Sequence, residues 1–370
     1  MSKARACLIP SCRVSDVEQI VKRYAEQIRS AAADKRPLRL RGGGSKDFYG
    51  QSLEGELLDT RAYRGIVAYE PSELVITVRC GTPLAELEAA LRAQRQQLAF
   101  EPPHFGPGAT VGGMVAAGLS GPRRQAAGAV RDFVLGVRML DGRGEDLSFG
   151  GQVMKNVAGF DVSRPMAGSM GTLGLLLEVS LKVPPLPFAE ATLKLELPQD
   201  KALAMLNHWG GKPLPISACA WCGGELALRL SGAPSALEAA RAAIGGETVA
   251  AEQAEGYWRG IREQTDPFFG TDKPLWRMSL PSVAPPLSFP GAQLIEWGGS
   301  LRWLSCKADA RSIREAAAQA GGHATLFRAA DKSAGVFTPL APALARIHRN
   351  LKQAFDPAGI FNPGRMYPDL

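Results

Sequence analysis

The sequence predicts an α+β protein with two main parts. Glycine-rich turns characterise residues 42–174, and the run Pro184-Pro185-Leu186-Pro187 then breaks the chain. From residue 189 to about 335, strand-like and helical segments alternate, which is typical of an antiparallel, ferredoxin-like sheet with helices on one face. We therefore expect one domain over 1–187, a second over 188–338 and a short C-terminal segment over 339–370.

An amphipathic helix is expected near the N-terminus, over 16–30. Ser15-x-x-Glu18 is a capping box, in which two side chains satisfy free amides of the first turn, and apolar residues at helical spacing follow it. These residues are Val17, Ile20, Val21, Tyr24 and Ile28. Thr82-Pro83 predicts the start of a second helix over about 83–95, because proline fits the first helical position.

Short apolar runs predict the strands of the first domain. They cover 38–41, 65–69, 74–79, 133–140, 145–149 and 174–183. Asp141-Gly142 lies between two of these runs and predicts a hairpin, because both residues tolerate the positive φ of a tight turn.

Strands and helices alternate in the second domain. Strands are expected at 191–197, 216–221, 225–230, 247–251, 276–280, 294–297, 301–306 and 323–327, and helices at 201–209, 235–243 and 310–320. A last helix over 340–355 ends before Pro357, and a turn-rich tail follows it.

The composition excludes several classes of protein. With 45% hydrophobic and 21% charged residues, the chain is neither disordered nor fibrous. No apolar run approaches the ~18–20 residues that span a bilayer, and the N-terminus lacks the apolar core of a secretory signal. We therefore expect a cytoplasmic protein with free thiols.

The net charge of +7 leaves two interpretations open. Basic and acidic residues are interspersed along the chain. The surface is therefore either a solvated one biased to one sign, or it carries a basic face that attracts an anionic ligand or an acidic partner subunit. The sequence has no aromatic-plus-basic strand motif, so we expect no nucleic acid partner.

Cys219 and Cys222 form a C-x-x-C motif. A zinc site would need a second pair or nearby histidines, and an iron–sulfur site would need more cysteines. We interpret both as small hydrophobic residues in or beside a strand, with a redox or metal role as the alternative. No metal site is predicted.

The most specific local motif is Arg41-Gly42-Gly43-Gly44-Ser45-Lys46, directly after an expected strand. Consecutive glycines let successive N–H groups point into one concavity that binds phosphate oxygens. Arg41 and Lys46 add charge, and Ser45 adds a hydroxyl. The motif is neither a Walker A loop nor a Rossmann fingerprint, and by itself it is also compatible with a plain turn.

Two further glycine-rich blocks favour a binding role. Residues 107–118 predict a loop that enters a short helix of small residues, where a diphosphate can approach the backbone and the helix N-terminus favours an anion. Residues 168–174 lead into a strand. We expect one extended cofactor groove with a diphosphate near its middle. The candidates in the second block are Pro107, Gly108, Ala109, Thr110, Gly112, Gly113 and Gly118.

The three blocks resemble the FAD-binding domain of the vanillyl-alcohol oxidase / p-cresol methylhydroxylase superfamily. The resemblance covers residues 35–185 and the tail, whereas the second domain is similar only in its α+β pattern. It implies a two-part FAD-binding domain, a substrate or cap domain and a C-terminal segment that returns to the FAD-binding domain. It implies non-covalent FAD, because the pyrophosphate loop here contains neither His nor Cys.

The resemblance also implies FAD-binding residues outside the first two blocks. Gly128-x-Val130 matches a stretch that lies over the flavin, and the segments 155–161 and 168–174 match the closing motif along the FAD. The tail Asn362-Pro363-Gly364-Arg365 matches the family's returning C-terminus. The candidates are Gly128, Val130, Asn156, Gly159, Gly171, Gly174, Leu175 and Asn362.

Within the superfamily, the strings RGGGSKDFYG and KNVAGFDVSRPMAGSMGTLG are most similar to the FAD-binding subunits of heteromeric dehydrogenases that oxidise glycolate, a small 2-hydroxy acid. This resemblance implies two partners, namely a paralogous FAD-containing catalytic subunit and an iron–sulfur subunit. Any association with the inner membrane face would then run through these partners.

The catalytic candidates are His104 and Arg277. Superfamily members that oxidise 2-hydroxy acids carry a His-rich cluster with Glu near a divalent metal, but the four histidines here have no metal-ligand spacing. His104 precedes the second glycine block and would reach the flavin, and Arg277, on an expected strand, would clamp a carboxylate. A structural His104 and a snorkelling Arg277 are the alternatives.

Three functions remain open from the sequence. The chain is an FAD-binding subunit of a multi-subunit glycolate dehydrogenase, a self-sufficient flavin oxidoreductase in which Arg277 anchors the substrate carboxylate, or a scaffold in which FAD serves only the structure. The missing His cluster argues against the second function, and the nearly complete glycine set argues against an empty scaffold.

Overall fold

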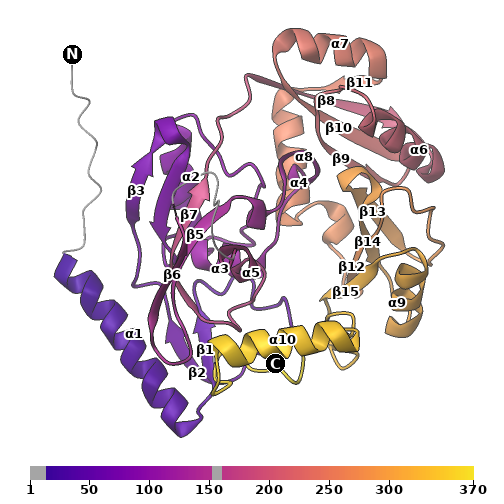
Figure 1. Cartoon of the computed structure of the whole chain (residues 1–370). Helices are drawn as coiled ribbons and strands as arrows, with labels where there is room; N and C mark the ends of the chain where they lie inside the picture. The colour runs from indigo at the N-terminus through magenta and orange to yellow at the C-terminus, as the bar shows by residue number, and fades with distance from the viewer. Residues whose placement is uncertain (1–13, 152–160) are drawn as a thin grey trace, which may run out of the picture.

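The computed structural model describes residues 14–151 and 161–370 (Figure 1). Its strands form a five-stranded sheet, an eight-stranded sheet and a two-stranded sheet. The five-stranded and two-stranded sheets come from the N-terminal half of the chain, and the eight-stranded sheet comes from the part that follows. The predicted α+β class with two main parts is therefore confirmed.

The elements of the N-terminal part largely follow the predicted ranges. They are α1 (Val14–Asp34), β1 (Leu38–Arg41), β2 (Glu56–Asp59), β3 (Ile66–Glu70), β4 (Val75–Arg79), α2 (Leu84–Ala93), α3 (Val111–Ala117), α4 (Arg124–Ala127), β5 (Val134–Leu140), β6 (Asp146–Gly150), α5 (Ser163–Met166) and β7 (Leu175–Lys182). α1 begins at Val14, so Ser15 lies inside the helix and is not the predicted cap. β2 was not predicted, because only Leu58 of its four residues is buried.

The five-stranded sheet is antiparallel, with the order β3-β4-β7-β5-β6, and β5 and β6 form the predicted hairpin. α2 and α3 pack on one face, where Leu84, Leu87 and Val115 are fully buried with the sheet residues. α1 and the parallel pair β1-β2 lie on the other face, where Tyr24 and Ile28 join a second core. α3 is thereby fixed between this sheet and the region of the candidate site.

The second part of the chain supplies every strand of the eight-stranded sheet. Its elements are β8 (Ala189–Glu196), α6 (Gln199–Gly210), β9 (Ile216–Cys222), β10 (Glu225–Gly232), α7 (Pro234–Ile244), β11 (Glu247–Val249), α8 (Ala251–Glu263), β12 (Leu275–Ser279), β13 (Ala292–Glu296), β14 (Leu301–Ser305), α9 (Ala310–Gln319) and β15 (His323–Arg328).

The order of this sheet is β11-β8-β10-β9-β13-β14-β12-β15, and all its pairings are antiparallel. Its first half has the β-α-β-β-α-β element order of a ferredoxin-like unit, as predicted. β12 to β15 and α9 extend the sheet, so that one continuous surface spans both halves.

Helices cover the two faces of this sheet differently. α6, α7 and α9 pack on the outer face, where Leu206, Leu237 and Ile313 are buried. α8 lies on the opposite face, between the sheet and the N-terminal part, and Trp258 packs there against small residues (Figure 1). The sequence analysis missed α8, although Ala254, Trp258 and Ile261 form a buried stripe at helical spacing.

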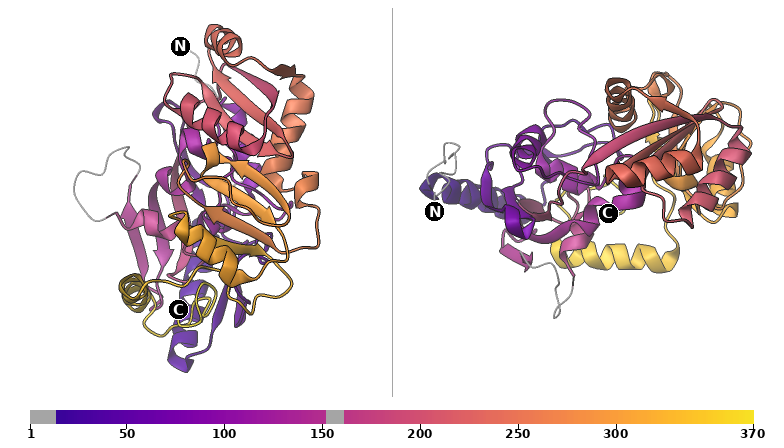
Figure 2. Two further views of the ribbon diagram at one scale, coloured as in Figure 1. Left: turned by 90° about the vertical axis from the view of Figure 1, so that its right-hand side faces the viewer. Right: turned by 90° about the horizontal axis from the view of Figure 1, so that it is seen from above.

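The C-terminal segment returns to the N-terminal part, as predicted (Figure 2). α10 (Pro342–Phe355) runs back from the eight-stranded sheet, and Leu38 of β1 donates to the Ile360 carbonyl over 2.7 Å. The buried ammonium of Lys352 donates to Asp356 (2.8 Å) and to the carbonyls of Thr172 (2.9 Å) and Phe361 (2.7 Å). This contact fastens the tail to the third glycine block.

Cys219 and Cys222 lie on opposite faces of β9. Cys219 belongs to the core under α6 and α7, whereas Cys222 packs on the side of the N-terminal part. Side chains three apart in a strand point in opposite directions, so these two thiols cannot form a disulfide with each other. The sulfur of Cys219 accepts from the Gly298 amide (3.0 Å) and donates to Gln125 (3.7 Å), and burial raises the pKa of both thiols.

None of the helices in the described ranges is long and apolar enough to cross a membrane. Within the same ranges, no group of three or more His, Cys, Asp or Glu side chains is arranged to hold a metal ion.

Candidate functional site

The first glycine motif forms one wall of a cleft, with about 550 Å³ of space that is partly open to solvent. The opposite wall consists of α3 and the residue that caps it, and the returning tail closes one end. Of the predicted cofactor residues, the following line the cleft: Arg41, Gly42, Gly43, Gly44, Ser45, Lys46, Thr110, Gly113 and Asn362. The sequence motifs at 41–46, 107–118 and 362–365 therefore meet in one place.

Backbone N–H groups dominate the wall formed by the glycine motif. Among the described residues, the consecutive amides from Gly43 to Lys46 have no acceptor. The carbonyl groups of the next residues already accept hydrogen bonds from side chains. Arg365 donates to the carbonyls of Lys46 (3.3 Å) and Asp47 (3.0 Å), and Lys332 donates to that of Phe48 (2.6 Å). A row of free donors therefore remains for an anionic ligand, as expected for a phosphate-binding nest.

Glycine is required at two positions because the loops approach closely. A Cβ atom on Gly43 would lie 1.4 Å from the carbonyl oxygen of Gly108, and one on Gly42 would lie 2.2 Å from Thr110 Oγ1. The first two glycine blocks are therefore packed against each other. Gly108, with its neighbours Pro107 and Ala109, supports the first loop and does not line the cleft.

Lys46 contributes the last of the free amides and a cation that lines the cleft. Its ammonium donates to the His104 carbonyl over 3.2 Å and lies 5.6 Å from the centre of the Phe105 ring. Burial lowers the pKa of Lys46 to about 8, and nearby Glu263 opposes this shift. Arg41 is turned to Asp47, with which it forms an ion pair of 2.6 Å.

The N-terminus of α3 does not offer the predicted anion site. Val111 donates to the Thr82 carbonyl (2.9 Å), Gly112 to the Cys80 carbonyl (2.8 Å) and Gly113 to Thr110 Oγ1 (3.2 Å). These three amides already have acceptors within the protein, because α3 packs against the end of β4, so they are not available to a ligand. The helix contributes a smooth wall of small residues to the cleft, and the free donors come from the first glycine motif.

Several other predicted cofactor residues pack away from the cleft wall. Gly112 faces Cys80, Gly118 faces Gly168, and Gly174 faces the Leu140 carbonyl. The others in this group are core or turn residues, namely Gly128, Val130, Gly171 and Leu175. Asn156 and Gly159 lie outside the described residues. The sequence motif as a whole suggested these residues. Only the folded structure shows which residues of a motif line the cleft and which support the loops around it.

Residues that the sequence analysis did not select complete the cleft. They are Leu40, Asp47, Leu53, Ala116, Ala117, Met170 and Arg365. Arg365 lies in the recognised tail motif, so the motif itself was an available signal. Asn362 of the same motif links two walls, because its side chain accepts from the Leu40 amide (2.8 Å) and donates to the Met170 carbonyl (2.7 Å).

A second, smaller pocket lies beside the cleft, where the eight-stranded sheet faces the N-terminal part. It encloses about 320 Å³ of space, part of it open to solvent. Arg277, Glu296, Trp303 and Phe327 line it from the sheet. Phe105, Leu119 and Ser120 line it from the loops on either side of α3, and Arg262 and Gln264 from the end of α8.

The two cavities are neighbours. Ala117 of α3 lines the cleft, and Leu119, two residues further on, lines the pocket. Tyr49 follows the glycine motif and lies near both Arg365 of the cleft and Arg277 of the pocket. The charges of these two arginines lower the pKa of Tyr49, although burial raises it by more. A ligand in the cleft therefore has the pocket directly at its side.

Arg277 lies on β12, on the face of the strand that is turned to the N-terminal part. Its guanidinium makes no hydrogen bond or ion pair with the residues that the structure describes, and it lies 5.3 Å from the centre of the Trp297 ring. Burial lowers its pKa. A half-buried cation without an ion pair is available to bind an anionic ligand.

Trp297 connects the eight-stranded sheet with the N-terminal part of the chain. Its φ of 53° is in the left-handed region, which is strained for a bulky residue. Its indole donates to the Gly121 carbonyl over 3.0 Å, and Arg124 lies 4.4 Å from its ring on the side of the N-terminal part. The ring is thus a bridge between Arg277 and the loop that follows α3.

His104 does not line either cavity, contrary to the prediction that it would reach the flavin. Its Nε2 atom lies 3.1 Å from Glu88 Oε2 on α2, and its amide donates to Glu263 over 3.0 Å. The two carboxylates thus hold both the ring and the backbone of His104. The alternative of a structural histidine is therefore the one that the structure favours.

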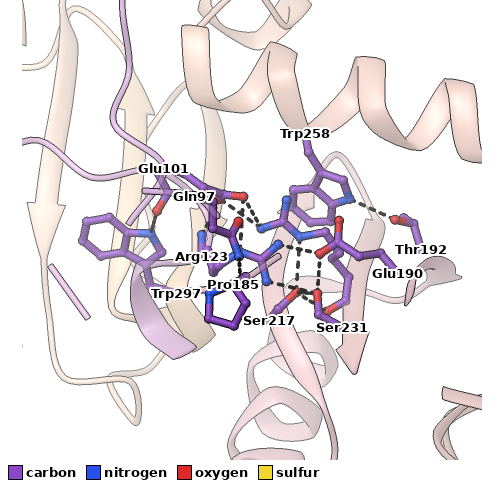
Figure 3. Close-up of polar contacts among 12 residues, drawn as sticks. Gln97, Glu101, Arg123, Pro185, Glu190, Thr192, Ser217, Ser231, Trp258 and Trp297 are labelled. Carbon is purple, nitrogen blue, oxygen red and sulfur yellow. Dashed lines mark hydrogen bonds and ion pairs between the residues drawn. The ribbon is translucent and has the colours of Figure 1, made fainter. Parts of the chain in front are cut away.

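A buried charge network fixes the sheet to the N-terminal part (Figure 3). Arg123 contacts Glu190 (2.5 Å) and Glu101 (3.4 Å), and Glu101 also contacts Arg229 of β10 (2.8 Å). Ser231 accepts from Arg123 over 3.1 Å. Because every charge in this network is paired across the interface, it fixes the orientation of the sheet that carries Arg277.

Comparisons with known proteins agree with this geometry. Residues 15–150 match the family model described as FAD binding domain. The chain is 51% identical over 345 residues to glycolate oxidase subunit GlcE of Escherichia coli (strain K12), which covers 93% of this chain and 97% of that protein. It is 32% identical over 132 residues to glycolate oxidase subunit GlcD of Bacillus subtilis (strain 168), which covers 35% and 27% of the two chains.

Solved structures share the fold. Alkyldihydroxyacetonephosphate synthase superposes with a TM-score of 0.64 at 14% identity, over 92% of this chain and 74% of that one. Fold and site together define an FAD-dependent oxidoreductase with a p-cresol methylhydroxylase-type FAD-binding domain. The chain belongs to the GlcE family of FAD-binding glycolate oxidase subunits.

The residues of the cleft fit FAD. The free amides from Gly43 to Lys46 match the charge and size of a diphosphate, and the side chains of Thr110, Ala116 and Ala117 leave room beside them. A Cβ on Gly43 would displace the loop that carries these amides. None of the described residues that line the cleft is His or Cys.

Proposed function

We propose that this chain is the FAD-binding subunit of a heteromeric glycolate oxidase and that it carries its own 2-hydroxy-acid site. The unpaired Arg277, in a pocket beside the FAD cleft, is the observation that carries the second part. The 51% identity to a protein named as a glycolate oxidase subunit supports the first part. FAD is bound without a covalent link.

Arg277 is the proposed carboxylate anchor. A guanidinium presents two parallel N–H donors to a carboxylate, and Lys cannot reproduce this geometry. The small volume of the pocket, about 320 Å³, favours short substrates such as glycolate. Bound FAD supplies the two-electron oxidant that removes hydrogen from the α-carbon, and the product is glyoxylate.

The proposed partners are a paralogous FAD-containing catalytic subunit and an iron–sulfur subunit. The relatives named as GlcE and GlcD subunits support an assembly of this kind. We propose a cytoplasmic location and assign any contact with the inner membrane to the partners.

The test compares the full chain alone and co-expressed with both partners. We expect Arg277→Lys to raise the glycolate KM roughly 10–100-fold, since a charge-assisted hydrogen bond contributes about 1.5–3 kcal/mol. FAD content per chain should not change, because Arg277 lies outside the cleft. An unchanged KM with wild-type FAD content would show that Arg277 does not anchor the substrate.

A further inference from the structure

We propose that Glu296 accepts the hydroxyl proton of the 2-hydroxy acid that Arg277 anchors. This inference rests on the proposed function and deepens it, because it assigns the acid–base group of the same pocket. The sequence analysis identified no proton acceptor, and Glu296 was not among its candidates.

Arg277 and Glu296 share one face of the eight-stranded sheet. Arg277 of β12 pairs with Trp303 of β14, and Glu296 of β13 pairs with the neighbouring Leu301. Directly paired residues point to the same face, as do residues two apart in a strand. The two charged residues are thus two strands apart, about 10 Å across the sheet. Their side chains therefore bracket a space that suits a ligand of a few atoms.

The Glu296 side chain is buried but only half satisfied. It is 4% exposed, and its Oε1 atom accepts from Trp303 Nε1 over 2.8 Å. No donor within the described residues reaches Oε2, and no ion pair neutralises the carboxyl group. A buried carboxyl group normally has a partner, so the free oxygen is the expected position of a ligand donor.

The fold keeps Arg277 and Glu296 apart although their charges are opposite. Trp303 occupies the strand between them and holds Oε1, and Trp297 positions the guanidinium over its ring. Within the described residues, no ion pair joins the two side chains. The cation and the proton acceptor are therefore both available to a ligand, because neither neutralises the other.

Burial raises the pKa of Glu296 to about 7, while the Trp303 hydrogen bond and Arg277 oppose the shift and Glu101 adds to it. A carboxyl group poised near neutral pH exchanges protons readily. The titratable and charged groups near it are Arg277 on β12, Tyr257 and Arg262 on α8, Glu101 in the loop after α2 and, from the opposite face of β9, Cys219.

In the proposed step, the substrate O–H bond breaks and its proton passes to Glu296 Oε2, while the C–O bond gains double-bond character. The α-carbon loses its hydrogen with the electron pair, for which FAD is the oxidant. A 2-oxo acid leaves, and Glu296 returns its proton to solvent.

The decisive variant is Glu296→Gln, because the amide oxygen can still accept from Trp303. We expect its kcat to fall by about 10²–10⁴-fold, the range for loss of a positioned acid–base group. In the wild-type protein kcat/KM should rise with pH through about 7, as Glu296 loses its proton. This limb should vanish in Glu296→Gln. Glu255→Gln, an exposed residue on α8, is the matched control.

Oxalate binding provides a readout that does not depend on turnover. Calorimetry of the FAD-loaded chain in two buffers of different ionisation enthalpy measures proton uptake on binding. Above pH 7 we expect uptake of up to about one proton per oxalate in the wild type, because the second carboxylate favours protonated Glu296. Glu296→Gln should bind oxalate with no uptake.

Two results would overturn the assignment of Glu296. These are an unchanged pH limb with wild-type kcat, or unchanged proton uptake, in Glu296→Gln. Failure of wild-type protein to bind oxalate or oxidise glycolate would instead overturn the proposed function. If Glu296→Gln does not fold, Glu296→Asp serves, since it should keep the pH limb and lose kcat. A wild-type kcat in Glu296→Asp would contradict the proposal.

Discussion

Replacement of Gly43 by alanine tests the cofactor cleft most directly. The new Cβ would lie 1.4 Å from the Gly108 carbonyl oxygen, a separation that no real Cβ atom shows, and the contacted atom is backbone. One of the two loops must therefore move. Overpacking of this kind costs about 1–3 kcal/mol.

The same movement misaligns the amides from Gly43 to Lys46 with the diphosphate. Each charge-assisted hydrogen bond contributes about 1.5–3 kcal/mol, so the loss of one such bond raises the FAD dissociation constant roughly tenfold to hundredfold. We expect the FAD dissociation constant of Gly43→Ala to rise at least 100-fold, with most of the protein isolated without flavin.

The assay is visible flavin absorbance per chain after gel filtration, followed by FAD titration with fluorescence detection. Gly256→Ala is the control, because a Cβ on Gly256 of α8 meets nothing within 4 Å. This variant should keep its FAD and gain about 0.5–1 kcal/mol of stability from the helix propensity of alanine. Wild-type FAD content and affinity in Gly43→Ala would refute the assignment of the loop.

Two further predictions concern lysines. Lys46 faces the cleft with a pKa of about 8, so both its positive charge and the FAD affinity should fall as the pH rises above 8. A bound diphosphate should raise the pKa of Lys46. FAD binding should therefore take up protons. Lys46→Met should weaken FAD binding at pH 7 and abolish this pH dependence; titrations over the pH range would contradict the assignment if both proteins gave parallel curves. Lys352→Met leaves Asp356 buried without its cation and should lower the free energy of unfolding by about 3 kcal/mol in urea titrations. A loss below 1 kcal/mol would show that the other contacts of the tail, which include its hydrogen bonds to Leu38 and Leu40, suffice to fasten it.

The sequence specified most of the fold because its local signals are strong. The hairpin at Asp141-Gly142, the alternation of strands and helices after Pro187 and the amphipathic α2 each follow from nearest-neighbour chemistry. α8 was missed even though its apolar stripe was present. β2 carried too weak a signal, because a short strand with one buried residue is not distinguishable from a loop.

The three glycine blocks together indicated the cofactor class, through their resemblance to a known FAD-binding domain, whereas the first motif by itself is also compatible with a plain turn. Tertiary structure decided which of the predicted residues line the cleft, because a glycine that accommodates a neighbouring loop has the same sequence signature as one that contacts a ligand. It also decided the pocket beside the cleft. Arg277, Glu296 and Trp303 lie on three strands, and their meeting depends on sheet order and register, which no local spacing encodes.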